Sequence, residues 1–364
     1  MSKYFIALQI EEIRDETSEA YTIRLRPENP DWLSYQAGQY LTVKIVIDGT
    51  EYRRAYSLSS SPLVDEQLCI TIKRVEGGKV SNYLRDHVRV GDRLEVMRPM
   101  GGFVFVPEVD RGRCYVLIGG GSGITPLMSI LATILHGEPL SVVYLWYGNR
   151  TSSSIIFREE LERLRHAYDS RLFIRHSLTQ PPSNWSGPSG RLDKNRIYSW
   201  ISDLFMTDEH RKQYYLCGPA GLMDAAEHAF DLHAVNPSDV HREWFAAPVP
   251  TEAEFDKVYR EEVVATETST PPETAHDITL QIQGEEHLLT VKPGQSILDA
   301  AIEANLDPPY ACMAGICSSC MAKLVSGEVR MEETTGLSQV ELDEGYILSC
   351  QAHPVTDDVS VRFE

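Results

Sequence analysis

The sequence has no surplus of basic charge and no internal repeat. It contains 34 Lys and Arg residues against 53 Asp and Glu residues, which gives a net charge of −19. Residues 247–364 carry −16 of this charge, whereas residues 1–246 carry only −3. An acidic C-terminal part argues against nucleic acid as a partner. It favours docking onto a basic protein surface or serves only to keep the chain in solution, and the sequence leaves both readings open.

The sequence also lacks a continuous membrane-spanning segment, although residues 114–135 are uncharged and long enough to cross a bilayer. Glycines at 119–121 and 123, followed by Pro126, divide this segment into a strand, a glycine turn and a helix. Thr125 is predicted to cap the helix, with Pro126 at its first position. The N-terminus is too acidic and its apolar run too short for a secretory signal, which predicts a cytoplasmic protein.

Cysteine is scarce, with seven in 364 residues. Cys69, Cys114 and Cys217 lie in separate regions, which argues against a disulfide framework. The other four follow the spacing C-x4-C-x2-C and a fourth 30 positions later: Cys312, Cys317, Cys320 and Cys350. Structural zinc sites usually take two short-spaced pairs, whereas three ligands plus one is typical of plant-type [2Fe-2S] ferredoxins. These four cysteines are therefore predicted to ligate a [2Fe-2S] cluster, and Gly315 suits the tight loop between them.

The chain is predicted to hold three domains and a linker. Residues 1–108 show period-two alternation and Gly-containing turns, which predicts an antiparallel β-barrel. Residues 111–246 alternate strands with helices, as in a parallel α/β sheet. Residues 247–275 are rich in Pro, Thr and Glu, which is typical of an extended linker. Residues 276–364 contain the cysteine loop and are predicted to form a β-grasp ferredoxin domain.

A flavin site is indicated in the barrel. Arg54, Tyr56 and Ser57 combine a cation for pyrophosphate, a ring that can stack on isoalloxazine and a hydroxyl for its N5. Alone, this motif is better explained as a solvated strand end, until a second flavin motif accompanies it. A glycine turn at Gly78 enters a short helix with Val80 and Ser81, and its N-terminal amides suit the flavin pyrophosphate.

A second glycine loop follows the strand that starts at Cys114. It comprises Gly119, Gly120, Gly121, Ser122, Gly123 and Thr125. Its amides and the dipole of the following helix favour a dinucleotide phosphate. The spacing departs from G-x-G-x-x-G, so it is no Rossmann fingerprint, and a purely structural turn remains an alternative.

Arg150 follows a predicted strand at residues 141–147, where the adenosine ribose of a nucleotide would lie. No Asp or Glu occurs between Glu138 and Glu159 to bind a free 2′-hydroxyl, as NAD sites commonly do. This predicts NADPH rather than NADH as the preferred donor. The alternative reading of Arg150 is a solvated loop cation.

Taken in order, these motifs resemble the ferredoxin-NADP⁺ reductase superfamily. Arg-x-Tyr-Ser, the loop ending in Thr-Pro, Cys217-Gly218-Pro219 and Glu243-x-Phe245 carry the resemblance. With its ferredoxin domain, the chain looks like the reductases of bacterial oxygenases, of the phenylacetyl-CoA epoxidase and 3-ketosteroid 9α-hydroxylase types. The resemblance implies FAD binding by Arg54, Tyr56, Ser57, Gly78, Val80 and Ser81. It also implies nucleotide binding by Gly119 to Thr125 and by Cys217, Gly218 and Pro219, with Cys217 near the reactive carbon and Glu243 and Phe245 close to the flavin.

The implied activity is hydride transfer from NAD(P)H to FAD, with Tyr56, Ser57, Cys217 and Glu243 at the reacting atoms. Electrons then leave singly through the cluster to an oxygenase component, since a flavin exchanges two-electron for one-electron transfer. One alternative is a reductase for a non-oxygenase acceptor such as a hybrid-cluster protein. Another is a redox-sensing binding module, which need not turn over.

Overall fold

The computed structural model describes residues 4–27, 34–204, 211–245, 274–337 and 339–363. The chain divides into two compact units. The larger unit contains residues 6–52 and 56–245, and the smaller contains residues 246–364 with residues 1–5 and 53–55. The predicted linker at 247–275 lies almost wholly outside the described residues.

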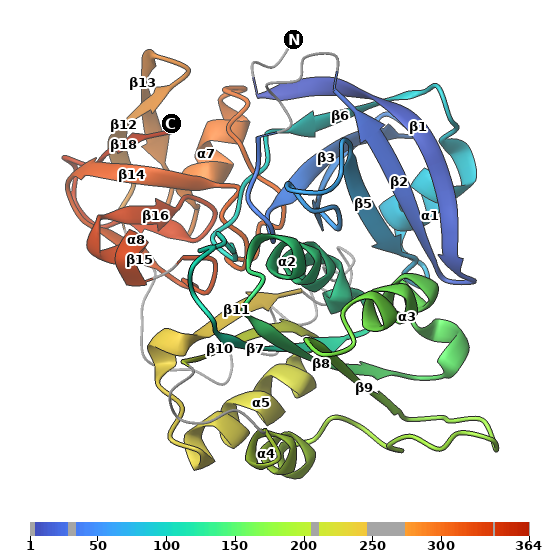
Figure 1. Ribbon diagram of the computed structural model, residues 1–364. Coiled ribbons are helices and arrows are strands. Elements are labelled where there is room, and N and C mark those ends of the chain that lie inside the picture. Colours follow the sequence, from blue (N-terminus) through green and yellow to red (C-terminus); the bar gives the residue numbers. More distant parts are fainter. Residues whose placement is uncertain (1–3, 28–33, 205–210, 246–273, 338, 364) are drawn as a thin grey trace. The chain divides into compact units, whose positions relative to one another are not determined.

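The larger unit begins with an antiparallel sheet, drawn in blue to teal in Figure 1. Its strands are β1 (Phe5–Thr17), β2 (Ala20–Arg26), β3 (Tyr40–Ile47), β4 (Thr50–Ser57), β5 (Leu68–Lys73) and β6 (Arg93–Met97). They pair in the order β4-β3-β6-β1-β2-β5. A bridge between Leu58, directly after β4, and Ile70 of β5 joins the two edges, so the sheet closes on itself. The predicted antiparallel barrel is confirmed.

Apolar side chains fill this barrel because they recur at every second position of its strands. Ile23 and Leu25 of β2 are fully buried, as is Ile70 of the neighbouring strand β5. Helix α1 (Lys79–His87) adds Val80 and Leu84 to the same core. The helix thereby fixes the glycine turn before it against the barrel.

The rest of the larger unit is built on a parallel sheet. Its strands are β7 (Cys114–Gly120), β8 (Val142–Asn149), β9 (Leu172–Leu178), β10 (Lys212–Gly218) and β11 (Val240–Trp244). They lie in the order β11-β10-β7-β8-β9, and each neighbouring pair is parallel. The carboxyl ends of all these strands therefore meet at one edge of the sheet. The predicted parallel α/β sheet is confirmed.

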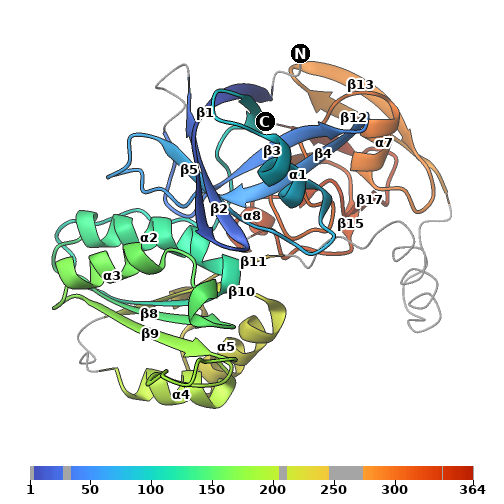
Figure 2. The same ribbon diagram turned by 90° about the vertical axis from the view of Figure 1, so that its right-hand side faces the viewer.

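Helices cover both faces of this sheet, as Figures 1 and 2 show. The helices are α2 (Ile124–Gly137), α3 (Arg158–Ala167), α4 (Lys194–Ser202) and α5 (Ala220–Leu232). Alternate residues of β7 belong to two cores: Tyr115 and Leu117 pack in the core with α2 and α3, whereas Val116 and Ile118 pack with α4 and α5. Helix α4 was not predicted from the sequence, although its N-cap residue Asp193 accepts a hydrogen bond from the amide of Arg196, the third residue of the helix.

The start of α2 differs from the sequence prediction. The helix begins at Ile124 after Gly123, so Thr125 is its second residue and no side chain caps it. The Thr125 hydroxyl donates instead to the carbonyl oxygen of Ser122, 3.0 Å away. The predicted Thr125 cap is therefore wrong, because the preceding 3-10 turn leads into a helix that begins two residues earlier than predicted, with Pro126 at its third position.

The smaller unit contains a five-stranded mixed sheet and a two-stranded ribbon. The strands are β12 (His276–Ile282), β13 (Glu285–Val291), β14 (Met321–Ser326), β15 (Val329–Met331), β16 (Tyr346–Leu348), β17 (Ala352–Pro354) and β18 (Ser360–Arg362). The main sheet has the order β13-β12-β18-β14-β16, and β15 pairs with β17. Helix α7 (Ile297–Glu303) packs on it, capped by Ser296, and α8 (Gln339–Asp343) is a short turn near β16. The predicted ferredoxin-like fold is confirmed.

In the part of the chain that the structure describes, none of the helices combines the length and the apolar character needed to cross a membrane.

Candidate functional site

The glycine loop and the Cys-Gly-Pro turn meet at the carboxyl edge of the parallel sheet. Cys217 is the sheet partner of Gly119, which places the ends of β10 and β7 side by side. A Cβ atom on Gly123 would lie 2.1 Å from the carbonyl oxygen of Cys217, a distance that no side chain tolerates. Glycine is therefore required at position 123 for the two turns to touch.

Gly120 is the second glycine of the loop that lies close to the Cys-Gly-Pro turn. A Cβ atom there would lie 2.9 Å from Cδ of Pro219, which is the N-cap residue of α5. Gly218 is equally confined, since its own Cβ would lie 3.1 Å from the backbone nitrogen of Gly120. Gly121 has φ +55° and opens the turn into α2, and Tyr147 donates a hydrogen bond of 2.8 Å to its carbonyl oxygen. The result is one backbone surface with the positive end of α2 beside it, which suits a phosphate.

Three predicted catalytic residues converge beside this surface. The Ser57 hydroxyl at the end of β4 donates a 3.4 Å hydrogen bond to the Glu243 carboxylate on β11. Glu243 is also the sheet partner of Cys217 on β10. The structure thus brings together a hydroxyl, a carboxyl and a thiol that are far apart in the sequence.

The surrounding protein changes the titration of this group of residues. Removal from water raises the pKa of Glu243 to about 8, and the hydrogen bond from Ser57 opposes part of that shift. Burial, reinforced by the nearby Glu243 carboxylate, raises the pKa of the Cys217 thiol well above its usual range. The thiol of Cys217 is therefore neutral, which argues against a nucleophilic role.

Phe245 and Tyr56 lie at the margins of this group. Phe245 is partly buried and packs against the core cluster that includes Cys217. Tyr56 is partly buried against the barrel core. Arg54, on the same strand as Tyr56, donates a 2.7 Å hydrogen bond to the carbonyl oxygen of Arg53. Their contacts with a flavin remain predictions.

The first turn of α1 is held by its serine. Gly78 is the N-cap residue, and Ser81 Oγ accepts a 3.1 Å hydrogen bond from the Val75 amide. Tyr21 donates a 2.8 Å hydrogen bond to the Ser81 carbonyl oxygen. Val80 is buried in the barrel core, so its part in cofactor binding is limited to its backbone. These bonds fix the turn in a shape whose N-terminal amides suit a pyrophosphate.

Arg150 lies next to a carboxylate that is distant from it in the sequence. Its guanidinium is 3.5 Å from Oε2 of Glu19, and Nζ of Lys73 is 3.6 Å from the same oxygen. The segment between Glu138 and Glu159 indeed contains no acid, but Glu19 brings a carboxylate to Arg150 from elsewhere in the chain, so the lack of a local acid does not by itself favour NADPH. Glu19 sits at the tip of the β1–β2 hairpin, and no local sequence signal links that hairpin to the loop after β8.

The four predicted cluster ligands form two thiol pairs. Sγ of Cys317 is 3.1 Å from Sγ of Cys312, and Sγ of Cys320 is 3.3 Å from Sγ of Cys350. Four thiolates are the ligand set of a [2Fe-2S] cluster, and two pairs provide two ligands for each iron. The residues therefore fit the predicted cluster.

The loop that carries Cys312 and Cys317 is shaped by positive φ angles. Met313 has φ +55° and Gly315 has φ +72°. A Cβ atom on Gly315 would lie 2.6 Å from Cβ of Glu333, so glycine is required there for both conformation and space. Backbone amides of this loop donate to Cys312, including that of Ala314 at 3.4 Å. Such donors stabilise thiolates and adjust the potential of a bound cluster.

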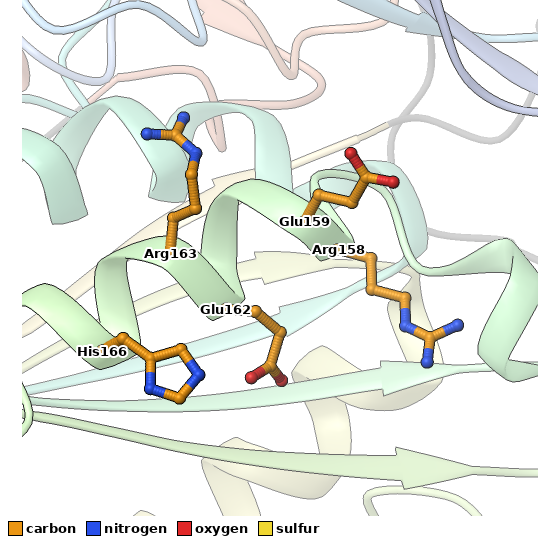
Figure 3. A pocket seen from close by; sticks show the side chains of 5 residues that line it. All are labelled: Arg158, Glu159, Glu162, Arg163 and His166. Atoms are coloured by element: carbon orange, nitrogen blue, oxygen red, sulfur yellow. The ribbon is translucent and has the colours of Figure 1, made fainter.

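A surface hollow over α3 has a different character. Figure 3 shows the five side chains that line it. All belong to this one helix: Arg158, Glu159, Glu162, Arg163 and His166. Glu159 and Arg163 point to one side of the helix and the others to the opposite side. Mixed charges in this arrangement are typical of a solvated helix face, and no predicted site residue lies there.

Three segments of the chain match known domain families. Residues 7–105 match the oxidoreductase FAD-binding domain, and residues 117–228 match the oxidoreductase NAD-binding domain. Residues 280–355 match the 2Fe-2S iron-sulfur cluster binding domain. These matches confirm the predicted cofactor classes: FAD, a nicotinamide nucleotide and a [2Fe-2S] cluster.

Full-length relatives extend this finding. The chain is 36% identical over 366 residues to a subunit of 1,2-phenylacetyl-CoA epoxidase from Escherichia coli strain K12, covering 99% of this chain and 98% of that protein. It is 32% identical over 365 residues to the ferredoxin reductase component of 3-ketosteroid-9-alpha-monooxygenase from Rhodococcus rhodochrous, covering 98% and 97%. Among solved structures, phthalate dioxygenase reductase shares the fold, with a TM-score of 0.58, 23% identity and coverage of 99% and 98%.

Proposed function

Because the chain belongs to the family of oxygenase reductase components that join FAD-binding, NAD-binding and 2Fe-2S domains, we propose that it transfers electrons from NADPH to a partner oxygenase. NADH is the alternative donor. FAD, when bound, supplies the conversion of hydride transfer into single-electron transfer. The observation that carries the proposal is the convergence of Ser57, Cys217 and Glu243 beside the glycine loop.

In this proposal the protein supplies orientation rather than acid–base chemistry. The glycine loop and the Cys217–Pro219 turn hold the nucleotide, with Cys217 near its reactive carbon. Ser57 holds the Glu243 carboxyl through their hydrogen bond. Arg54, Tyr56 and the amides after Gly78 hold the flavin. Fixed surroundings of this kind favour hydride transfer because the reacting rings are placed before the reaction starts.

The proposed route ends at the four cysteines and an external acceptor. We propose domains at 1–108, 111–246 and 276–364, with a linker at 247–275, in a cytoplasmic protein. Cys69, Cys114 and Cys217 are unpaired, which supports a reducing compartment. The −16 charge of residues 247–364 supports a partner with a basic docking surface. An epoxidase or hydroxylase of the kind that the relatives' names specify is the proposed acceptor.

Anaerobic titration of the purified holoprotein tests this proposal. NADPH should bleach the flavin absorbance and then produce the electron paramagnetic resonance signal of a reduced [2Fe-2S] cluster. Flavin bleaching without cluster reduction would contradict the electron order. Full reduction of both cofactors, with no transfer to a panel of epoxidase and hydroxylase components, would leave the reductase activity intact but refute the proposed partner class.

A further inference from the structure

One carboxylate oxygen contacts two cations at the nucleotide site. Oε2 of Glu19 is 3.5 Å from the Arg150 guanidinium and 3.6 Å from the Lys73 ammonium. All three side chains reach solvent, with relative exposures of 45% for Glu19, 60% for Arg150 and 30% for Lys73. An ion that enters from solvent can therefore reach the same two cations.

The backbone holds Glu19 in this place. The Glu19 amide donates a 3.1 Å hydrogen bond to Thr17 Oγ1, and its carbonyl oxygen accepts a 2.7 Å hydrogen bond from the Arg74 amide. Lys73 pairs with Ala20, the residue after Glu19, in the β2–β5 ladder. The side chain of Glu19 is consequently presented by fixed main chain, while its carboxylate remains exposed enough to turn away.

The two cations belong to a strongly positive part of the nucleotide site. Nζ of Lys73 is 4.0 Å from the position of a Cβ atom on Gly121, the first residue of the turn into α2. The start of α2 adds the positive end of a 14-residue helix dipole. Residues 117–228, which include Gly121 and Arg150, match an NAD-binding domain, so the anion expected there is a nucleotide phosphate.

We propose that Glu19 is an internal counter-ion that occupies this anion site in the nucleotide-free protein and must leave when the phosphates bind. Its carboxylate pairs with both Lys73 and Arg150 and offsets part of their positive charge, and an incoming phosphate competes with it for both cations. Glu19 is thus a specificity-determining residue: it lowers the affinity for every nucleotide and penalises most the one with an additional 2′-phosphate. This inference rests on the proposed binding of NAD(P)H at the glycine loop.

Binding measurements on the FAD- and cluster-loaded protein test the inference without turnover. The probes are ADP-ribose and 2′-phospho-ADP-ribose, which carry the phosphates but no nicotinamide, titrated by calorimetry. Glu19→Gln keeps the size of the side chain and removes its charge. It should lower the Kd for ADP-ribose about twofold and that for the 2′-phosphorylated probe up to about tenfold, the range expected for two exposed ion pairs.

Glu12→Gln is the matched control. Glu12 forms a 2.9 Å ion pair with Arg24 on the same barrel and is 41% exposed, so this variant makes the same charge change beside a different cation. It should leave both Kd values unchanged. Equal tightening by the two variants would attribute the effect to net charge and overturn the proposal.

Further outcomes separate this inference from the function on which it rests. Unchanged binding in Glu19→Gln refutes the counter-ion role. Weaker binding of ADP-ribose alone also refutes it, because Glu19 would then accept the ribose hydroxyl. When Lys73 is replaced in Lys73→Met, the decrease in Kd caused by Glu19→Gln should be smaller, since the Glu19–Lys73 ion pair is already absent. Failure of the wild-type holoprotein to bind either probe would instead refute nucleotide binding at this site.

Discussion

The Ser57 hydroxyl donates a 3.4 Å hydrogen bond to the Glu243 carboxylate, although 186 positions separate the two residues in the chain. Ser57 ends a strand of the FAD-binding barrel, whereas Glu243 lies on an edge strand of the parallel sheet. This bond joins the two halves of the larger unit at the point where flavin and nicotinamide are proposed to meet. Burial raises the pKa of Glu243 well above that of an ordinary glutamate, so the stability of the folded protein should depend on pH.

Stability should fall as the pH rises from about 5 to about 8, because the pKa of Glu243 is raised to about 8 from 4.5. Between these values the folded chain keeps a proton that the unfolded chain has released, so raising the pH favours unfolding. Glu243→Gln cannot titrate and should lose this part of the slope. Thermal unfolding of both proteins at several pH values measures it. Parallel curves for wild type and variant would mean that Glu243 is already ionised in the folded protein.

Gly123→Ala should destabilise the protein by about 1–3 kcal/mol, the usual effect of overpacking. The added Cβ would lie 2.1 Å from the Cys217 carbonyl oxygen, so one of the two turns must move. Nucleotide affinity should also fall, because both turns belong to the proposed nucleotide site. The matched control is Gly221→Ala in α5, where a Cβ meets nothing within 4 Å and alanine favours the helix. Urea unfolding measures the free energy of unfolding of both variants, and equal values for Gly123→Ala and Gly221→Ala would contradict the predicted clash.

Cys317→Ser should remove the cluster and leave the flavin bound. Cys317 and Cys312 form one thiol pair, 3.1 Å apart, so the variant leaves one iron with a single cysteine ligand. Ferricyanide, which takes electrons from flavin directly, should still be reduced. Cytochrome c reduction should be largely lost because it needs a one-electron carrier. Iron analysis and both assays check this, and undiminished cytochrome c reduction in cluster-free protein would contradict the electron order.

Arg150→Ala should weaken NADPH binding by about 1.5–3 kcal/mol, the range for a hydrogen bond to a charged group, and affect NADH little. The expected cause is loss of the contact with the 2′-phosphate. Kinetic constants for both nucleotides measure the difference. Equal losses would show that Arg150 binds a group common to both nucleotides, and a wild-type preference for NADH would also count against its proposed role.

Electron transfer to the partner should slow as ionic strength rises from about 0.02 to about 0.5 M, because exposed charges are progressively screened over this range. The expectation rests on the −16 charge of residues 247–364. Ferricyanide turnover is the control, since it involves no protein docking. A partner rate that does not change with salt would mean that the acidic surface only keeps the chain in solution.

The sequence predicted those features whose signal is local. The four cysteines have a spacing that only a few sites use, and strand alternation with glycine turns indicated both the barrel and the parallel sheet. The first residues of helices were predicted less accurately. A 3-10 turn precedes Ile124, so α2 begins before the predicted cap at Thr125. A turn of this kind depends on the close contact with Cys217, which a local pattern does not encode.

Contacts across the fold explain the remaining differences. Glu19 reaches Arg150 only because the β1–β2 hairpin lies beside the nucleotide-binding sheet, and nothing in the sequence around either residue indicates the other. The Ser57–Glu243 bond is also long-range, and only the family resemblance brought these two residues into one site. Residue types were therefore predictable, whereas their electrostatic partners were not.

The contact between Gly123 and Cys217 also limits how this protein can be altered. The loop proposed to bind the phosphates and the turn proposed to bind the nicotinamide touch through backbone atoms, with no side chain between them to absorb a shift. A change in the path of one must be matched by the other. Chimaeras that exchange nucleotide preference among relatives should consequently transplant both segments together. Either segment alone would lack the backbone contact that fixes its conformation.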